Sequence, residues 1–304
     1  MTATLQQPPV TPAGPPPADP TRTPLGRGLL WAGVALGVVI IGWGGLQAAD
    51  LAMSSTERAN ATYDAAGVVE LVADGRVSVS AGDDDAVDVE RIARSGFTSP
   101  TYSVQERGDR LVVRHECGSW FGVCEGALEV HVPRGTEVVV RTSNGAVVAR
   151  GLSGDLDAQT SDGRVEVTGI TGDAQLRTSN GGVVVTDVTG DVSARTSDGR
   201  IDADGIGGHL DAVTSNGSVQ VGDVDGDARV RTSDGSIDVA AVQGDVEAVT
   251  SNGSVVVVGT GEPVALTIST SNGRQTVEAP TDPSASRTVV IRSSDGNVSY
   301  LGPR

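Results

Sequence analysis

A four-residue motif, Thr-Ser-Asn/Asp-Gly, repeats at a constant spacing along the second half of this 304-residue chain. Its copies begin 18 residues apart, at Thr142, Thr160, Thr178, Thr196, Thr214, Thr232 and Thr250. Two looser copies begin at Thr270 and Ser293, after steps of 20 and 23 residues. Such a period is typical of folds in which each repeat is one supersecondary unit that stacks on its neighbours.

Apolar and polar residues alternate within each repeat, which is the period of a β-strand. In the repeat that begins at Thr178, Val183 and Val185 mark one strand. Val192 and Ala194 mark a second strand, after a Gly-Asp turn. Each repeat therefore predicts two short strands and two turns, with one face of each strand directed inward.

One repeat alone is too small to fold. Burying about six small side chains contributes roughly 10 kcal/mol, whereas ordering each residue costs about 1–2 kcal/mol. Stacking must supply the difference, so we predict a single-stranded β-solenoid (a β-helix) with 18-residue coils over residues 136–304. The small inward residues favour a flattened, two-sided coil, and a three-sided coil is the alternative. Prolines at 263, 280 and 283 are expected to close the stack, because proline cannot continue a strand ladder.

Residues 64–135 also show strand patterns, but outside the 18-residue register. We expect them to form an antiparallel, membrane-proximal β cap from which the solenoid starts. Residues 47–63, between this cap and the preceding apolar segment, are expected to be a linker.

The N-terminal region predicts a membrane anchor. Residues 1–28 hold eight prolines and are expected to form a disordered tail. Residues 29–46 follow without a charge, which at about 1.5 Å per residue is close to the thickness of one bilayer core. Arginines precede this segment and acids follow it, so we expect a single-pass protein of the cell membrane with a cytoplasmic N-terminus and an extracytoplasmic C-terminal domain. A cleaved signal peptide is the competing interpretation.

Composition excludes some functions. The formal net charge is −17, which repels nucleic-acid phosphates, so no nucleic-acid partner is expected. The chain has only eight aromatic residues. None lies between Val123 and Ser299, so a stacking platform for sugars is missing there.

Cys117 and Cys124, the only cysteines, flank a short segment between two predicted strands. In an oxidising compartment a disulfide is the favoured interpretation. A metal site with His115 is the alternative, although two thiols and one histidine are too few ligands for structural zinc.

The Thr-Ser-Asn/Asp-Gly motif itself is interpreted as a turn, because these residues tolerate turn backbones and cap them. Asn and Asp alternate in successive copies, which would keep stacked aspartates about 10 Å apart, two coils of the stack.

The aspartates of the Gly-Asp turns form a second column. Asp155, Asp173 and Asp191 would lie one coil apart, where three carboxylates repel one another unless they are solvated, hydrogen-bonded to turn amides or bridged by a cation. They are the only candidate calcium ligands, while His209 interrupts the column.

Catalysis is not expected. His115, His131 and His209 share no spacing with a nucleophile that would indicate a triad or dyad. We therefore predict no enzyme activity, no catalytic residues and no cofactor.

The chain resembles the DUF4097 family of bacterial β-strand-repeat proteins, known as putative adhesins. The resemblance covers roughly residues 65–300 and is carried by Glu129-Val-His-Val-Pro133, by Arg141-Thr-Ser-Asn-Gly145 and by the repeats that follow. It implies an extracytoplasmic β-solenoid with relatives near cell-envelope stress systems, and it implies no catalytic or ligand residues.

Two hypotheses for function follow. In the first, the chain is an anchored, adhesin-like structural or interaction module whose exposed faces, around Arg177, Arg195 and Arg231, bind an envelope protein or a surface ligand. In the second, it is an accessory sensor or regulator of an envelope-stress response, with the proline-rich tail as its cytoplasmic contact.

Overall fold

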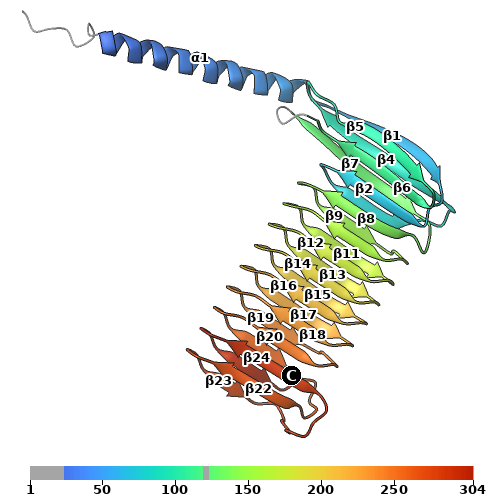
Figure 1. The fold of residues 1–304 in the computed structure, drawn as a ribbon, viewed down its shortest axis with the longest axis vertical. Helices are drawn as coiled ribbons and strands as arrows, with labels where there is room; N and C mark the ends of the chain where they lie inside the picture. The colour runs from blue at the N-terminus through green and yellow to red at the C-terminus, as the bar shows by residue number, and fades with distance from the viewer. Residues whose placement is uncertain (1–23, 119–122, 304) are drawn as a thin grey trace, which may run out of the picture. The chain divides into compact units, whose positions relative to one another are not determined.

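The computed structural model describes residues 24–118 and 123–303. It separates into two compact units, the first ending at Ala52 and the second running from Met53 onward. The first unit is one helix, α1 (Pro24–Met53), and the second unit is built from β-strands (Figure 1).

Helix α1 is longer than the predicted apolar segment 29–46. It begins at Pro24, a residue that suits the first helical position because the missing N–H has no partner there in any case. It continues through Asp50 to Met53, because isolated charges do not break a helix. Residues Ala32–Met53 are long and apolar enough to cross a membrane. Most of the predicted tail, residues 1–23, lies outside the described residues.

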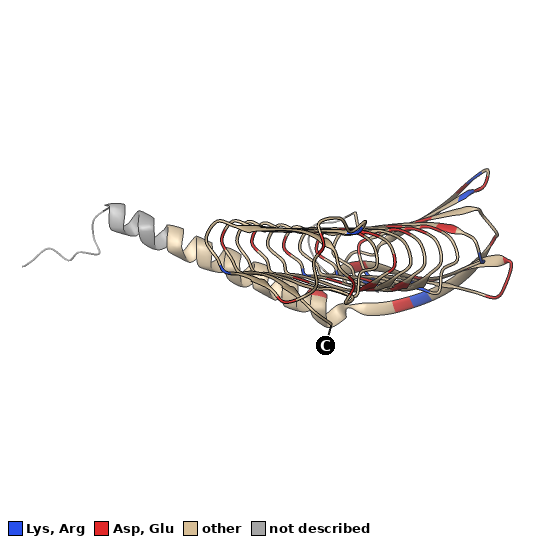
Figure 2. Cartoon of the chain, turned by 90° about the horizontal axis from the view of Figure 1, so that it is seen from below, with Lys and Arg blue, Asp and Glu red and all other residues tan. Residues whose placement is uncertain are grey.

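The second unit consists of two sheets that face each other. Sheet A has 13 strands in the order β1-β4-β7-β3-β9-β11-β13-β15-β17-β19-β21-β25-β23, and sheet B has 12 in the order β22-β24-β20-β18-β16-β14-β12-β10-β8-β2-β6-β5. Figure 2 shows the two flat layers and the turns that join them. The result is a mostly parallel, solenoid-like stack with two sides rather than three.

The strands of sheet A are β1 (Ser55–Asp64), β3 (Val77–Ala81), β4 (Ala86–Ser95), β7 (Cys124–Val132), β9 (Val147–Arg150), β11 (Val165–Ile170), β13 (Val183–Val188), β15 (Ile201–Ile206), β17 (Val219–Val224), β19 (Ile237–Ala240), β21 (Val255–Val258), β23 (Gln275–Val277) and β25 (Val298–Leu301). The strands of sheet B are β2 (Val68–Ala73), β5 (Thr101–Arg107), β6 (Arg110–Glu116), β8 (Glu137–Thr142), β10 (Leu156–Gln159), β12 (Ala174–Arg177), β14 (Val192–Arg195), β16 (Leu210–Val213), β18 (Ala228–Arg231), β20 (Val246–Val249), β22 (Ala265–Thr270) and β24 (Thr288–Ser293).

The middle of the stack follows the sequence repeat. In sheet A, Val165 pairs with Val183 and Val183 pairs with Ile201, each step covering 18 residues. In sheet B, Leu156 pairs with Ala174 in the same way. The alternating apolar residues point between the sheets and are buried, so each pair of strands, one from each sheet, adds one layer to a continuous aliphatic core.

The N-terminal end corrects two predictions. Residues 47–63 are not a linker, since α1 runs to Met53 and β1 then pairs antiparallel with β4. Residues 64–135 are not a purely antiparallel cap. Strands β2 and β3 pair parallel with β8 and β9, and so they already form a layer of the stack. Among the described residues, antiparallel pairing is confined to the pairs β1–β4, β4–β7 and β5–β6.

Both ends of the stack depart from sequence order. At one end, the layer β2–β3 lies between β6–β7 and β8–β9, which come later in the chain. At the other end, the final layer β24–β25 lies between β20–β21 and β22–β23, which come before it. The irregular steps to Thr270 and Ser293 therefore reflect a layer inserted out of order. The outermost layer is β22–β23, where Val277 is 46% exposed.

Candidate interaction surface

The Thr-Ser-Asn/Asp-Gly turns are structural. The buried Thr214 hydroxyl donates to the carbonyl oxygen of Gly199 in the neighbouring layer, at 3.1 Å, and accepts from the N–H of Gly217, at 3.2 Å. The same pair of bonds recurs at Thr160, Thr178, Thr196 and Thr232. The motif thus satisfies buried backbone groups where one layer turns into the next.

The alternation of Asn and Asp in these turns has a direct purpose. Asn252 Nδ2 donates to Asp234 Oδ1 at 2.7 Å, and Asn180 and Asn216 donate in the same way to Asp162 and Asp198. Each amide therefore bonds the carboxylate of the layer before it. Two carboxylates could not pair in this manner, since an ionised Asp only accepts, whereas Asn supplies the donor.

The aspartates of the Gly-Asp turns, with His209 at the equivalent position, form a second column. We call it the Asp ladder, and it comprises Asp155, Asp173, Asp191, His209, Asp227 and Asp245. Each side chain accepts the backbone N–H of the next member, over distances of 2.7–3.0 Å, and Asp245 accepts from Thr288. His209 does not interrupt the ladder, because its Nδ1 accepts the N–H of Asp227. That acceptor role places the proton of the neutral ring on Nε2.

The ladder changes the interpretation of the calcium candidates Asp155, Asp173 and Asp191. One oxygen of each carboxylate is bonded to a turn amide, which is one of the three ways in which stacked carboxylates are tolerated. Within residues 24–118 and 123–303, no group of three or more Asp, Glu, His or Cys side chains is arranged to hold a metal ion.

We therefore expect calcium to leave stability unchanged. The full chain should unfold at the same temperature in millimolar calcium and in excess chelator, as followed by circular dichroism. A matched variant, Asp173→Asn, keeps the side-chain oxygen that accepts an N–H while removing the charge. If calcium raised the unfolding temperature of the parent by several degrees but not that of Asp173→Asn, the ladder would be a cation site after all.

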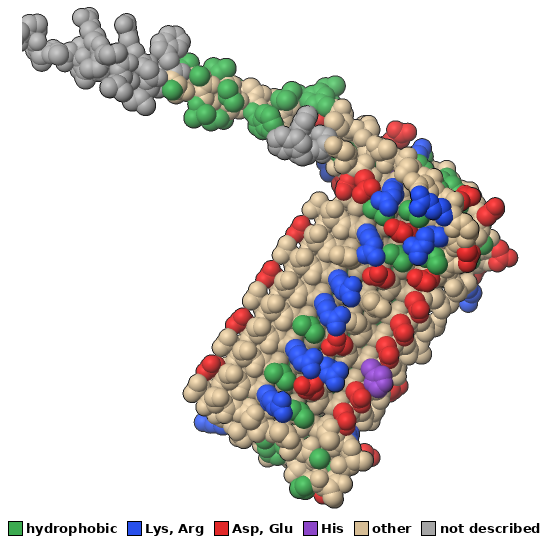
Figure 3. Space-filling view, viewed as in Figure 1, with side chains coloured by type: hydrophobic (Ala, Val, Ile, Leu, Met, Phe, Trp, Pro, Cys, Tyr) green, Lys and Arg blue, Asp and Glu red, His purple; other side chains and the backbone are tan. Residues whose placement is uncertain are grey.

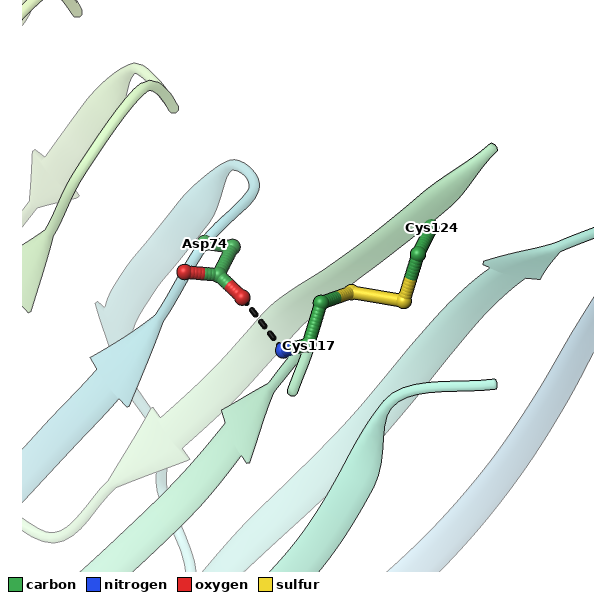
Figure 4. Close-up of a disulfide and its surroundings, with 3 residues drawn as sticks. All are labelled: Asp74, Cys117 and Cys124. Atoms are coloured by element: carbon green, nitrogen blue, oxygen red, sulfur yellow. Dashed lines mark hydrogen bonds between the residues drawn. A yellow bond between two sulfur atoms is a disulfide. The ribbon is translucent and has the colours of Figure 1, made fainter. Parts of the chain in front are cut away.

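Cys117 and Cys124 are joined by a disulfide with Cα atoms 6.0 Å apart. It closes the connection between β6 and β7, and the N–H of Cys117 donates to Asp74 (Figure 4). His115 is not part of a metal site here. It is buried and its Nδ1 contacts the carbonyl oxygen of Ala127 at 3.1 Å.

An aromatic cluster lies near this disulfide. Tyr102 contacts Tyr63 through their hydroxyls at 2.7 Å, contacts the ring of His115 edge to face, and is covered by the Arg91 guanidinium at 4.6 Å. Burial lowers the pKa of His115, and burial together with the bond to Tyr63 raises the pKa of Tyr102. Both groups are therefore uncharged at neutral pH. The cluster extends the core to the N-terminal end of the stack.

The three histidines do not meet one another. His131 contacts the Ser80 hydroxyl through Nδ1 at 2.8 Å, a pair that sequence spacing did not indicate because 51 residues separate the two. Asp88 lies opposite His131 in the register but accepts from Thr62. In the described part of the chain no carboxylate is hydrogen-bonded to His131, so the pair lacks the third group of a triad.

The outward face of sheet B carries a row of arginines. The register of successive strands places five arginines at equivalent, outward-facing positions in one column. We call this column the arginine stripe, and it comprises Arg141, Arg177, Arg195, Arg231 and Arg292. The three residues singled out from the sequence, Arg177, Arg195 and Arg231, all belong to it. Figure 3 shows this basic band along the face, with acidic side chains in rows on both sides.

Several stripe arginines bind acids of the column beside them. Arg195 bonds Asp211, and Arg231 bonds Glu247 at 2.8 Å. Glu247 also accepts from Arg229 at 2.9 Å, and these bonds lower the pKa of Glu247. Arg177 and Arg292 are exposed and form no ion pair with any described residue. They leave positive charge available to a partner.

A shallow groove of about 740 Å³ runs beside the stripe. Its lining spans the layers from β12 to β24 and includes Asp173, Asp191, Asp227 and Asp245 of the ladder. Sheet B therefore presents an acidic groove and a basic stripe in parallel. The outward face of sheet A differs, because it has no column of arginines among the described residues. Its basic residues include Arg150 and Arg200, and Arg200 pairs with Asp202. Its acids include Glu166, Asp202, Asp204 and Asp238.

The fold places this protein in the class of repetitive, two-sided, solenoid-like β proteins. It also has an apolar helix and a sheet face with rows of charged side chains. Its family is also clear: the model of the Toastrack DUF4097 family matches residues 72–302, and the chain belongs to that family. No protein in the curated collection matches the sequence.

Solved structures with a similar fold include two described as putative adhesins. One from Bacteroides fragilis is 12% identical, with 81% of this chain and 97% of that chain covered and a TM-score of 0.34. One from Parabacteroides merdae is 11% identical, with 81% and 96% covered and a TM-score of 0.35. A putative lipid binding protein from Parabacteroides distasonis is 11% identical, with 80% and 96% covered and a TM-score of 0.43.

Proposed function

We propose that this protein is a membrane-anchored, extracytoplasmic interaction module of the cell envelope, adhesin-like and without enzyme activity. Helix α1 is the anchor in this proposal, with the basic Arg22 and Arg27 on the cytoplasmic side. The β stack is a rigid display scaffold, since every layer is bonded to its neighbours through backbone and threonine ladders.

The arginine stripe is the observation that carries the proposal. Arginine is favoured at interfaces because its planar guanidinium makes several directed bonds. Five arginines in one column on a flat sheet are more than the stack needs for its own ion pairs, as Arg177 and Arg292 show. The alternative role, an accessory regulator of envelope stress, would place its contact in residues 1–28, whereas the proposal rests on the described surface.

The proposal predicts contacts from sheet B in living cells. A photo-reactive residue replaces Val213, within the stripe column, or Val184 on the outward face of sheet A. Both versions of the full chain should remain in the membrane pellet after an alkaline wash. After illumination, Val213 should yield covalent adducts at about tenfold the level of Val184, because only sheet B presents the stripe.

Introducing Arg177→Glu together with Arg231→Glu should suppress the adducts at Val213. Equal labelling from both faces would overturn the proposed use of sheet B, and release of the full chain by the alkaline wash would overturn the anchor.

A further inference from the structure

We propose that the partner of sheet B is a second copy of this chain, paired face to face and parallel through the arginine stripe and the Asp ladder. The inference rests on the proposed function, because it names the partner of the same surface. It follows from how the charges are arranged along each strand.

Each layer of sheet B carries a stripe position four residues after a ladder position. An acid at the ladder position is matched by an arginine in Asp173 with Arg177, Asp191 with Arg195 and Asp227 with Arg231, whereas Asp155 stands with Gln159, Asp245 with Val249 and Thr288 with Arg292. Glu137 and Arg141 stand at the same two positions of an earlier layer. In the layer where the ladder has the neutral His209, the stripe has Val213.

These matched residues do not pair within one chain. Four residues of extended strand separate them by about 13 Å. Arg195 and Arg231 instead bond Asp211 and Glu247. These two acids belong to the intervening column, which lies between the ladder and the stripe and comprises Asp157, Gln175, Ser193, Asp211, Arg229 and Glu247. The carboxylates of the ladder use one oxygen for a backbone N–H and are exposed. No ion pair of the described residues joins a ladder carboxylate to a stripe arginine.

A two-fold axis along the stack would bring the ladder of one copy and the stripe of the other together. Rotation by half a turn about an axis above the intervening column reverses the strand direction, so the stripe of one copy lies over the ladder of the other in the same layer. Asp173 then faces Arg177 of the second copy, and His209 faces Val213. Such an interface is isologous, and both copies enter their stacks at the same end, as two chains in one membrane require.

The size of the surface fits a stable pair. From β8 to β24 the face covers seven steps of about 4.8 Å and, with its side chains, a width of about 20 Å. This is roughly 700 Å² per copy, or about 1,400 Å² in total, within the usual range for specific interfaces. The groove beside the ladder accommodates the arginine side chains of the second copy, and it spans the same layers as Arg177–Arg292.

The helix gives independent support. Gly33, Gly37 and Gly44 lie on one face of α1, at spacings of four and seven residues. Small residues at this spacing let two parallel helices approach closely in a bilayer.

A cysteine near the two-fold axis tests the pairing. Ser193 lies in the intervening column of sheet B and would face Ser193 of the second copy, whereas Val184 lies on the outward face of sheet A. In membranes that contain the full chain, Ser193→Cys should form disulfide-linked dimers on oxidation at about tenfold the yield of Val184→Cys. Substituting Gly33 and Gly37 by leucine in both variants separates the contribution of the helix from that of the sheet.

Reversing the charges of the stripe and of the ladder tests the pairing more directly. In the Ser193→Cys background, a stripe variant (Arg177→Glu with Arg231→Glu) and a ladder variant (Asp173→Arg with Asp227→Arg) should each lose about nine-tenths of the dimer. Mixing the two variants should restore it, because each glutamate then faces an arginine and the unmodified half of the interface is intact. Asp173→Asn with Asp227→Asn keeps the side-chain oxygens that accept the ladder N–H groups. It should weaken the dimer less than the two arginine substitutions do. It therefore serves as the control for misfolding of the ladder variant.

Equal dimer yields from Ser193→Cys and Val184→Cys, or no recovery on mixing two folded variants, would overturn the pairing. If Ser193→Cys joins a different protein instead, the pairing is wrong and the proposed interaction module stands. If neither Ser193 nor Val213 gives any adduct, both proposals are wrong.

Discussion

Replacing Gly217 with alanine is expected to lower the free energy of unfolding by about 3 kcal/mol or more. The new β-carbon would lie 1.8 Å from the carbonyl oxygen of Gly199 in the neighbouring layer. That oxygen accepts the bond from Thr214 and belongs to the backbone, so it cannot move without separating two layers. The loss should appear in chemical unfolding followed by the β-sheet circular dichroism signal.

Gly222→Ala is the matched control. It lies on β17, the strand that follows Gly217, and its β-carbon would approach only Asp204, with the Oδ1 atom as the first contact, at 2.4 Å. The end of a side chain can rotate aside, so stability should change by about 0.5 kcal/mol or less. Equal effects of the two substitutions would mean that the turn glycines are not held by contact between layers.

Replacing Tyr300 with alanine is expected to cost about 3–5 kcal/mol. Tyr300 is the largest fully buried side chain in the described part of the chain. It lies on β25, which has β21 on one side and β23 on the other, so the cavity would open inside the stack rather than at its edge. Unfolding in denaturant measures the loss.

Tyr300→Phe should behave in the opposite way. The Tyr300 hydroxyl is buried and has no hydrogen-bond partner, so its removal relieves an unpaired polar group and should raise stability by about 1 kcal/mol. A phenylalanine variant that is as unstable as the alanine variant would show that the hydroxyl, and not the ring, holds this layer.

The sequence predicted the middle of the stack well and its ends poorly. Alternation at Val183 and Val185 has one physical solution, a strand with one buried face, and the constant step sets the register of the next layer. The pairing of Val68 with Glu137, or of Val255 with Val298, has no local signature, because it joins segments distant in sequence. Strand β1 was missed because its exposed, polar residues follow no apolar alternation.

The surface was predicted in part. Arg177, Arg195 and Arg231 were identified from their positions in the repeat, and the structure places them in one column. Their relation to the ladder could be recognised only from the structure. Asp173 and Arg177 lie on the same face of sheet B only if the segment between them is extended, so that every second side chain points outward. The role of Asp191 as an acceptor for the N–H of His209 also needed the structure, because a carboxylate that binds a turn amide and one that binds a cation look the same in sequence.

The two layers that lie out of sequence order, β2–β3 and β24–β25, constrain the order in which layers can form while the chain is synthesised from its N-terminus. The layer of Val69 and Leu71 gains both neighbours only after β6–β7 and then β8–β9 have been synthesised, some seventy residues later. From β9 to β21 each newly synthesised segment can pair at once with the layer made just before it. The last segment then has to enter between two layers that are already present. The stack is therefore incomplete until β24 and β25 have been synthesised. A chain that stops before β24 lacks the layer that joins β20–β21 to β22–β23.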